Sequence, residues 1–235
     1  MTVLAALQSA AIRLVGNRPS VFFSSTDQFQ QELVDLVNEA ATDIVKYNDW
    51  QSLTSVANFT GDGIITAFAT PDGYDRMMLT AEVQDLNNWV WGYQHVPSIN
   101  DFLMVKAREL GPYPGIWTIY DDQFQFYPPP AAGQLATFPY INKNYARGAD
   151  TVTKPAFTKD DDEFRIPGGE RLLTLWLVWR WRENKKMDWT GDQENFVKAI
   201  DEMAAKDRGS RVYRSGTSRI QGRFHTAWPF SLGPV

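Results

Sequence analysis

Cysteine is absent from the 235 residues of the chain. The absence excludes disulfide bonds, zinc sites built on thiolates and a cysteine nucleophile, so packing must hold the fold together. Histidine occurs only at His95 and His225, which do not form the His-Glu-x-x-His pair of a metalloprotease. The Gly-x-Ser-x-Gly elbow of α/β-hydrolases and the phosphate-binding P-loop are also missing. We therefore expect no catalytic residues, no metal site and no cofactor.

Long apolar runs are missing too. The longest extends from Leu172 to Trp179 and is interrupted by Thr174, whereas a helix that spans a bilayer needs about 20 apolar residues. The N-terminal stretch MTVLAALQSAAIRLVGNRP lacks the basic start and the long apolar block of a signal peptide. We expect neither a membrane span nor export through a secretion pathway.

Acidic residues do not occur in residues 208–235, where Arg208, Arg211, Arg214, Arg219 and Arg223 give a formal charge of +5. Residues 1–207 hold all 28 acidic residues and 18 Lys and Arg, a formal charge of −10. An acidic body with a basic, Gly- and Ser-containing end is typical of a folded unit that carries an arm for a partner.

Apolar residues recur with helical spacing near both ends of the chain. The spacing predicts helices over residues 3–15, 25–48, 169–187 and from 190 to about 207. Ser25 and Gln28 have the spacing of a capping box, as do Thr190 and Gln193. The short link MDWTG makes the last two helices antiparallel neighbours.

The segment LLTLWLVWRWRENKKMDW, residues 172–189, carries four of the nine tryptophans. Trp176 and Trp179 fall on one helical face with leucines, and Trp181 lies on its flank with Arg180 and Arg182. Aromatic stripes at this spacing are usually buried packing, so we predict Trp176 and Trp179 in the core of a helix bundle. A groove for a sugar or for single-stranded nucleic acid is the alternative.

After Trp50 the period changes to short aromatic or β-branched stretches separated by Gly, Pro, Asp and Asn, which predicts antiparallel strands. The stretches are LTSVANF, IITAFA, NWVWGY, GIWTIY, QFQFY and LATFPYI. Asp121 and Asp122 divide two alternating runs and predict a tight hairpin. Pro139 predicts an edge strand because it lacks an N–H. One helix is expected to start after Ser98, which has capping spacing with Asp101.

The aromatic residues of this β-rich region offer a second binding hypothesis. They are Trp89, Trp91, Tyr93, Trp117, Phe124, Phe126 and Tyr127. Such rings could stack on sugars or bases, but they are equally what a small sheet needs for its core. The charge of −10 on the body disfavours nucleic-acid binding.

Residues 146–164 are polar and lack a period, so we expect a connecting loop. The run Asp160-Asp161-Asp162-Glu163 within it fits a solvated loop and lacks the spaced ligands of a calcium site. The predicted fold is therefore α+β: an antiparallel bundle of the N- and C-terminal helices with an inserted β-rich module and an extended C-terminal arm. The expected parts are residues 1–50 with 165–207 (bundle), 51–145 (β-rich module), 146–164 (loop) and 208–235 (arm).

Several segments, in this order and spacing, resemble the head-to-tail adaptor proteins of tailed phages, the group that includes tubular tail protein A and the tail accessory factors of short-tailed phages. They are TDQFQQELVDLVNEAATDIVKYNDWQSLT, GIWTIYDDQFQFYPPP, YINKNY, LLTLWLVWRWRENKKMDW and the partner helix reaching AAKDRGSR. The resemblance covers most of residues 1–207. It departs at the end, because many members stop soon after the last helix, whereas this chain continues for another 27 residues.

The resemblance implies a structural virion protein without catalysis. Such proteins form a ring, commonly dodecameric, between the portal and the tail nozzle or tail tube, with a tail fibre as a further candidate partner. The ring extends and seals the channel for double-stranded DNA, which passes without sequence recognition, and it permits genome ejection. The implied location is the tail or neck of the virion, and the host cytoplasm before assembly. Arg180 and Arg182 are the expected subunit contacts.

The arm is expected to bind the portal through basic and aromatic residues, with a neighbouring adaptor subunit as the alternative partner. These residues are Arg211, Tyr213, Arg214, Arg219, Arg223, Phe224, Trp228 and Phe230. Two other functions stay open: a carbohydrate-binding or tail-fibre-attachment module that uses the aromatic β region, and a small hydrolase whose site residues the sequence does not reveal.

Overall fold

The computed structural model describes residues 2–78, 83–85, 92–109, 111 and 115–207. These residues divide into two compact units. A helical unit is built from both ends of the described chain together with residues 70–78, and a β unit lies within residues 58–69 and 83–138. The chain first leaves the helical unit within strand β1, returns to it for residues 70–78, and comes back to it finally within strand β8.

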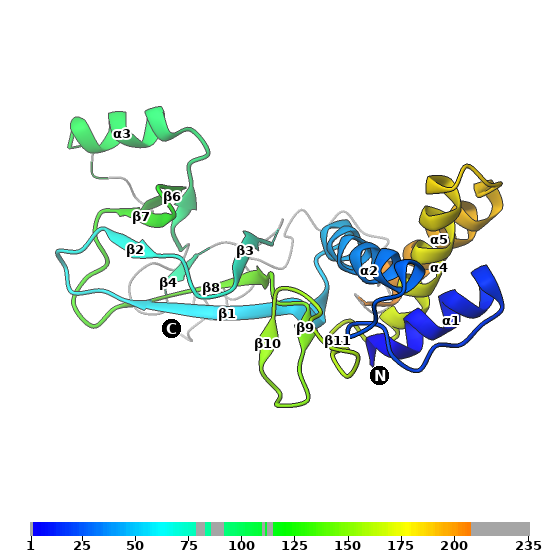
Figure 1. Cartoon of the computed structure of the whole chain (residues 1–235). Coiled ribbons are helices and arrows are strands. Elements are labelled where there is room, and N and C mark those ends of the chain that lie inside the picture. The colour runs from blue at the N-terminus through cyan, green and yellow to red at the C-terminus, as the bar shows by residue number, and fades with distance from the viewer. Residues whose placement is uncertain (1, 79–82, 86–91, 110, 112–114, 208–235) are drawn as a thin grey trace, which may run out of the picture. The chain divides into compact units, whose positions relative to one another are not determined.

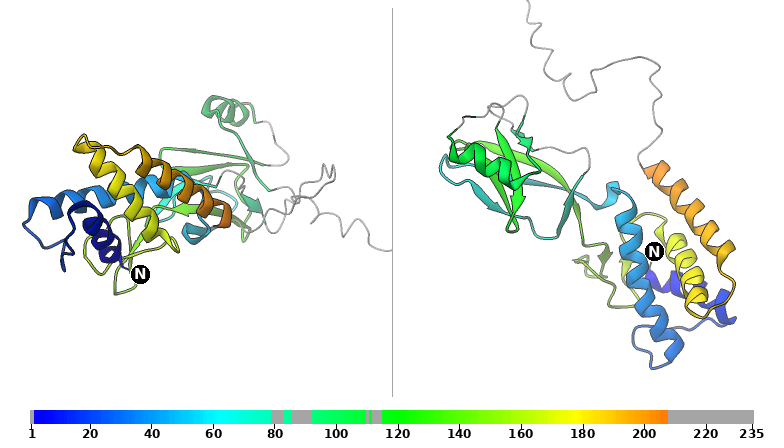
Figure 2. Two further views of the ribbon diagram at one scale, coloured as in Figure 1. Left: turned by 90° about the vertical axis from the view of Figure 1, so that its right-hand side faces the viewer. Right: turned by 90° about the horizontal axis from the view of Figure 1, so that it is seen from above.

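Four helices form the helical unit, as predicted (Figure 1). They are α1 (Val3–Val15), α2 (Gln28–Tyr47), α4 (Gly169–Asn184) and α5 (Thr190–Asp207). The central helix is α4, because it packs against each of the other three; the view from above shows it between α2 and α5 (Figure 2, right). No helix in the described part of the chain is long and apolar enough to cross a membrane.

Each of these helices turns an apolar face inward. Leu33 and Ile44 of α2, Leu7 of α1 and Leu173 of α4 are completely buried. Trp50, just after α2, is also buried, and its indole Nε1 donates a hydrogen bond of 2.7 Å to the carbonyl oxygen of Ile44. The ring thus both fills the core and satisfies a carbonyl near the C-terminal end of α2.

The helix ends differ in detail from the predicted capping boxes. Helix α2 begins at Gln28, and its N-cap is Asp27, whose carboxylate accepts a hydrogen bond from the Gln30 N–H at 3.2 Å. The predicted cap Ser25 instead accepts a hydrogen bond from the Asp27 N–H. Helix α4 ends at Asn184, three residues before the predicted Met187. Lys186, which follows that end, has a φ of 58°, so the helix does not continue through it.

The connecting stretch after the β module contains a small sheet in the order β10-β9-β11. Its strands are β9 (Ala146–Arg147), β10 (Thr153–Lys154) and β11 (Glu163–Phe164). Tyr145, Phe157 and Phe164 are buried and make edge-to-face ring contacts with one another. Strands of two residues are too short for alternation to reveal, which is why the sequence indicated only a loop.

Strand β8 (Leu135–Asn142) is not the edge strand that Pro139 predicted. It lies between β1 (Thr54–Thr60) and β3 (Tyr74–Met77), and it also pairs with β4 (Gln84–Asp85). The register explains how the proline is accommodated. The pairs with β3 end at Tyr140 and the pairs with β4 begin at Thr137, so Pro139 falls in the interval between two partners.

The β unit contains a second sheet in the order β2-β7-β6-β5; Figure 1 labels β2, β7 and β6. Its strands are β2 (Ala67–Ala69), β5 (Gln94–His95), β6 (Ile116–Tyr120) and β7 (Gln123–Tyr127). The predicted hairpin is confirmed, because Asp121 and Asp122 have φ values of 55° and 54°, as a two-residue type I′ turn requires. The pair β5–β6 is parallel, against prediction, since α3 (Ile99–Ala107) supplies the crossover between these strands.

Candidate interaction surfaces

Arg180, a predicted subunit contact, already has partners within its own chain. Its Nη1 lies 2.6 Å from Oε2 of Glu183, and its Nη2 lies 3.3 Å from Oε1 of Glu39 on α2. The guanidinium also lies over the rings of Trp176 and Trp179, at 6.0 and 5.6 Å from their centroids. The hydrogen bond with Glu183 raises the pKa of Arg180 above its ordinary value. This arginine joins α4 to α2 at the surface of the bundle.

Arg182, the second predicted subunit contact, forms an ion pair with Asp192 in the first turn of α5. Nearby, Lys185 Nζ lies 2.9 Å from Glu32 of α2 and 5.5 Å from the ring centroid of Trp181. The hydrogen bond from Lys185 keeps the pKa of Glu32 below its ordinary value. Ion pairs thus join the C-terminal end of α4 to α2 and to α5.

The tryptophans of α4 belong to the bundle core and its border. Trp176 is 1% exposed, as predicted, and Trp179 is half-buried and packs edge-on against it, with ring centroids 5.6 Å apart. Trp181 packs edge-on against Phe29, and its Nε1 donates to Glu32 at 3.1 Å. These contacts occupy the faces on which a stacking ligand would have to lie. They favour the core interpretation over a groove.

The described aromatic residues of the β region also favour the core interpretation over a binding surface. Phe124 and Phe126 are completely buried and Trp117 is 2% exposed. The ring of Phe124 lies 4.5 Å from that of Phe138 and 5.6 Å from that of Trp117. Trp89 and Trp91 lie outside the described residues. Three of the seven aromatic residues named for the carbohydrate-binding alternative, Trp117, Phe124 and Phe126, are therefore core side chains in β6 and β7.

One apolar surface of the β unit was not predicted. Ile64 and Ile65, between β1 and β2, are 82% and 49% exposed. The Asp62 carboxylate accepts hydrogen bonds from the N–H groups of both, at 2.8 and 2.7 Å, and these bonds lower the pKa of Asp62. The hydrogen bonds to Asp62 thus hold the backbone of the loop tip, while the side chains of Ile64 and Ile65 face solvent.

Two carboxylates of the acidic run after β10, Asp160 and Asp162, are structural, so the expectation of a solvated loop was wrong for them, whereas Asp161 is exposed. Asp162 is completely buried and forms an ion pair with Lys154 at 2.7 Å. Its carboxylate also accepts hydrogen bonds from the N–H groups of Thr158 and Lys159, at 2.7 and 3.0 Å. Burial opposes ionisation of Asp162, but these bonds outweigh it and lower its pKa. Asp160 accepts from the N–H of Phe22 at 3.0 Å.

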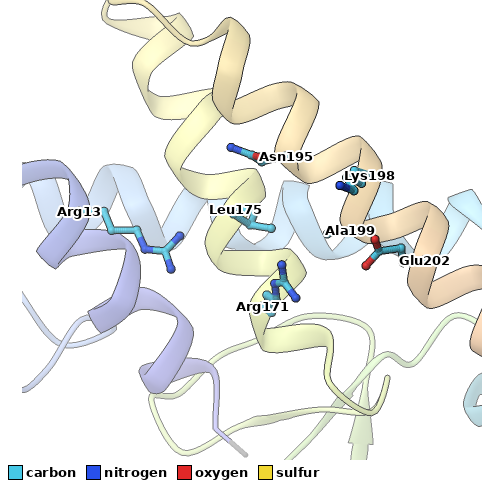
Figure 3. Close-up of a pocket in the computed structure, with 7 residues that line it drawn as sticks. All are labelled: Arg13, Arg171, Leu175, Asn195, Lys198, Ala199 and Glu202. Atoms are coloured by element: carbon cyan, nitrogen blue, oxygen red, sulfur yellow. The ribbon is translucent and has the colours of Figure 1, made fainter.

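A basic groove lies where α1, α4 and α5 meet (Figure 3). It has a volume of about 310 Å³ and is lined by Arg13, Arg171, Leu175, Asn195, Lys198, Ala199 and Glu202. Half-buried Leu175 and buried Ala199 form its apolar part, whereas the three cationic residues are exposed. With three cations and one carboxylate, the lining carries a formal charge of +2 on a body that is otherwise acidic.

Where the structure describes the chain, no group of three or more His, Asp and Glu side chains could hold a metal ion. His95 packs against Trp117, with ring centroids 4.5 Å apart, and burial lowers its pKa. His225 lies beyond the described residues. Charge and exposed apolar side chains are thus the features that the described surface offers to partners.

Comparison with protein families identifies the family of the chain. Residues 1–221 match the family described as SU10 adaptor protein. The chain belongs to the SU10 adaptor protein family. No curated protein matches the sequence. Membership makes the chain a structural phage adaptor, implies a place in the virion, and implies contacts with portal and tail proteins.

The match to the adaptor family also extends into the arm. It includes Arg211, Tyr213, Arg214 and Arg219 and ends before Arg223, Phe224, Trp228 and Phe230. All eight of these predicted portal-binding residues lie outside the described residues, so their role stays a prediction. The resemblance found in residues 1–207 is confirmed and reaches further along the chain than the motifs that revealed it.

Proposed function

We propose that copies of this chain form a ring, dodecameric as in similar adaptors, between the portal and the tail nozzle. The ring extends and seals the DNA channel and later permits genome ejection. The observation that carries the proposal is the match to an adaptor family over residues 1–221. The protein waits in the host cytoplasm and joins the virion at assembly, where the nozzle or tube, and a tail fibre, are its distal partners.

The charge of the body supports a passage for DNA that does not hold it. Residues 1–207 carry a formal charge of −10. Phosphate binding by proteins depends on cationic surface that displaces the counterions of DNA. A predominantly acidic ring is therefore suited to let the duplex slide through without sequence recognition.

Arg180 and Arg182 stay proposed subunit contacts. Their ion pairs with Glu39 and Asp192 lie at the surface of the bundle and are half-exposed. Exposed pairs of this kind contribute about 0–1 kcal/mol each, so they can exchange partners with a neighbouring copy at little cost. Because each contact repeats around a ring, these small free-energy contributions would add up.

The arm, residues 208–235, is the proposed anchor on the portal. Its arginines would lie on acidic portal surface and its aromatic residues in apolar pockets, since these residue types commonly dominate interface energy. Truncation after Arg208 is expected to leave the helix signal and the melting of the body unchanged, while attachment to filled heads weakens and DNA leaks. Stable infectious particles built from the truncated protein would show that the folded body makes the docking contacts instead.

Electron microscopy of the protein mixed with its portal tests the ring itself. We expect a ring of adaptor density on one end of the portal, and no ring from the adaptor alone, because early polymerisation would block assembly. Portals that stay bare at saturating adaptor, together with binding of a soluble glycan by the monomer, would favour the carbohydrate-binding alternative.

A further inference from the structure

The three cations of the basic groove have no partners among the described residues. Arg13 of α1, Arg171 of α4 and Lys198 of α5 make no side-chain hydrogen bond and no ion pair with any part of the chain that the structure describes. This contrasts with Arg180 and Arg182 on the same bundle, which are both paired. The groove is therefore a basic surface of the helical unit, within the described residues, that is free to receive an external carboxylate.

The groove opens on the side of α4 that faces away from α2. Arg171 and Arg180 are nine positions apart, which is about half a revolution at 3.6 residues per turn. Since Arg180 contacts Glu39 of α2, Arg171 must point to the other side of the helix. Figure 3 agrees, with α1, α4 and α5 in front and α2 behind them.

The outer face of α2 carries the complementary charge. Asp35, Glu39 and Asp43 follow one another at intervals of four residues, and all three are exposed. Helical residues four apart lie on one face, so these carboxylates form a continuous acidic row. The row lies opposite Val37 and Ile44, which are completely buried. Asp35 and Asp43 have no side-chain partner in the described chain.

We infer that the basic groove of one copy receives the acidic face of α2 of the next copy. This contact rests on the proposed ring function and identifies the two surfaces that build it. The complement of the groove is present on the same chain and on the opposite side of the bundle. A contact between two different surfaces of identical subunits is head-to-tail, and it builds a ring where the rotation from one copy to the next closes.

The groove chemistry favours a protein carboxylate over DNA as its occupant. Glu202 lines the groove beside the cations, and the rest of the body is acidic, so a duplex would meet repulsion on every side of a small basic patch. The apolar part formed by Leu175 and Ala199 suits the methylene groups of a helix face better than a phosphate backbone. Charge pairs at the rim set the register and raise the association rate.

Two charge-reversed variants test this contact. The groove variant carries Arg13→Glu and Arg171→Glu, and the face variant carries Asp35→Lys and Asp43→Lys. All four positions are exposed, so each variant should keep the melting temperature of the parent within a few degrees. The matched control, Lys106→Glu with Arg108→Glu, reverses two exposed cations in the β unit on and just after α3.

The readout is ring formation on the portal, measured by native mass at low salt. Each variant alone should assemble about tenfold more weakly than the parent, because like charges meet at every contact, while the control assembles normally. A one-to-one mixture of the two variants should restore rings, since opposite charges then meet at every contact, and the rings should alternate strictly. The four-fold substituted chain should also assemble alone.

Three results would overturn the inference. Variants that assemble like the parent would show that the two surfaces do not meet, while the proposed ring would stand. Variants that fail alone and also fail in the mixture would show that the reversals act elsewhere. A groove variant that assembles but loses affinity for duplex DNA would assign the groove to nucleic acid. Failure of the parent itself to join the portal would instead contradict the proposed function.

Discussion

The helical unit and the β unit differ in what they bury and in what they expose. The helical unit buries aliphatic side chains, Trp176 and the carboxylate of Asp162, and its surface carries ion pairs between helices. The β unit buries a cluster of phenylalanines around Phe124 and exposes Ile64 and Ile65 on a fixed loop. We therefore expect the charged side chains of the helical unit to orient partners, and Ile64 and Ile65 to offer an apolar contact surface on the β unit.

The largest expected effects come from removing one ring from each core. Trp176→Ala and Phe124→Ala should each lower the free energy of unfolding by about 3–5 kcal/mol, because both side chains are buried. Each unit has its own core, so hydrogen exchange should speed up in the helices for the first variant and in β6 and β7 for the second. If either variant loosens both units equally, the two cores form one cooperative structure and the comparison fails.

A smaller effect is expected at the buried carboxylate. Asp162→Asn should cost about 2–4 kcal/mol, because it leaves Lys154 without its anion and replaces an acceptor of two backbone N–H groups. Asp161→Asn, at the exposed neighbouring position, is the control and should leave stability within about 0.5 kcal/mol of the parent. Equal melting of the two variants would mean that Asp162 carries no structural charge.

The pH dependence follows from the same site. The pKa of Asp162 is lower in the folded chain than its ordinary value of 3.8, so its contribution is complete above that value and is lost as the pH falls toward the folded pKa. The parent should lose more stability than Asp162→Asn between about pH 5 and pH 2. Parallel curves of urea unfolding against pH for the two proteins would contradict this account.

The smallest expected losses of stability come from removing one helix N-cap side chain in each unit. Asp27→Ala on α2 and Ser98→Ala on α3 should each cost about 1 kcal/mol, because each side chain accepts a hydrogen bond from an N–H in the first turn of its helix. Ser25→Ala should cost less, since Ser25 precedes the cap. A larger loss of melting temperature in Ser25→Ala than in Asp27→Ala would support the predicted capping box instead.

Helices and hairpins were predicted correctly where the local sequence is enough to determine the structure. The helical stripe through Trp176 and the hairpin at Asp121 needed no distant partner to be recognised. The position of β8 could not be predicted, because Pro139 is accommodated between two strands that come from elsewhere in the sequence. The same holds for Asp162, whose burial depends on strands of two residues that show no period.

The interaction surfaces were harder to predict than the fold. Sequence singles out Arg180 and Arg182 by their place beside a tryptophan stripe, but it does not show that Glu39 and Asp192 already pair with them. Nor does it show that Arg13 and Arg171 come together, since they are 158 positions apart in the chain. An unpaired charge becomes recognisable only when all its neighbours are known.

The proposed ring is tested by the mass of the complex that forms when the purified protein is titrated onto its portal. We expect an adaptor that is monomeric alone and that adds to the portal in one cooperative step to a fixed ring stoichiometry, with twelve copies expected from similar adaptors. A soluble monomer that never joins the portal, at any concentration tested, would contradict this expectation.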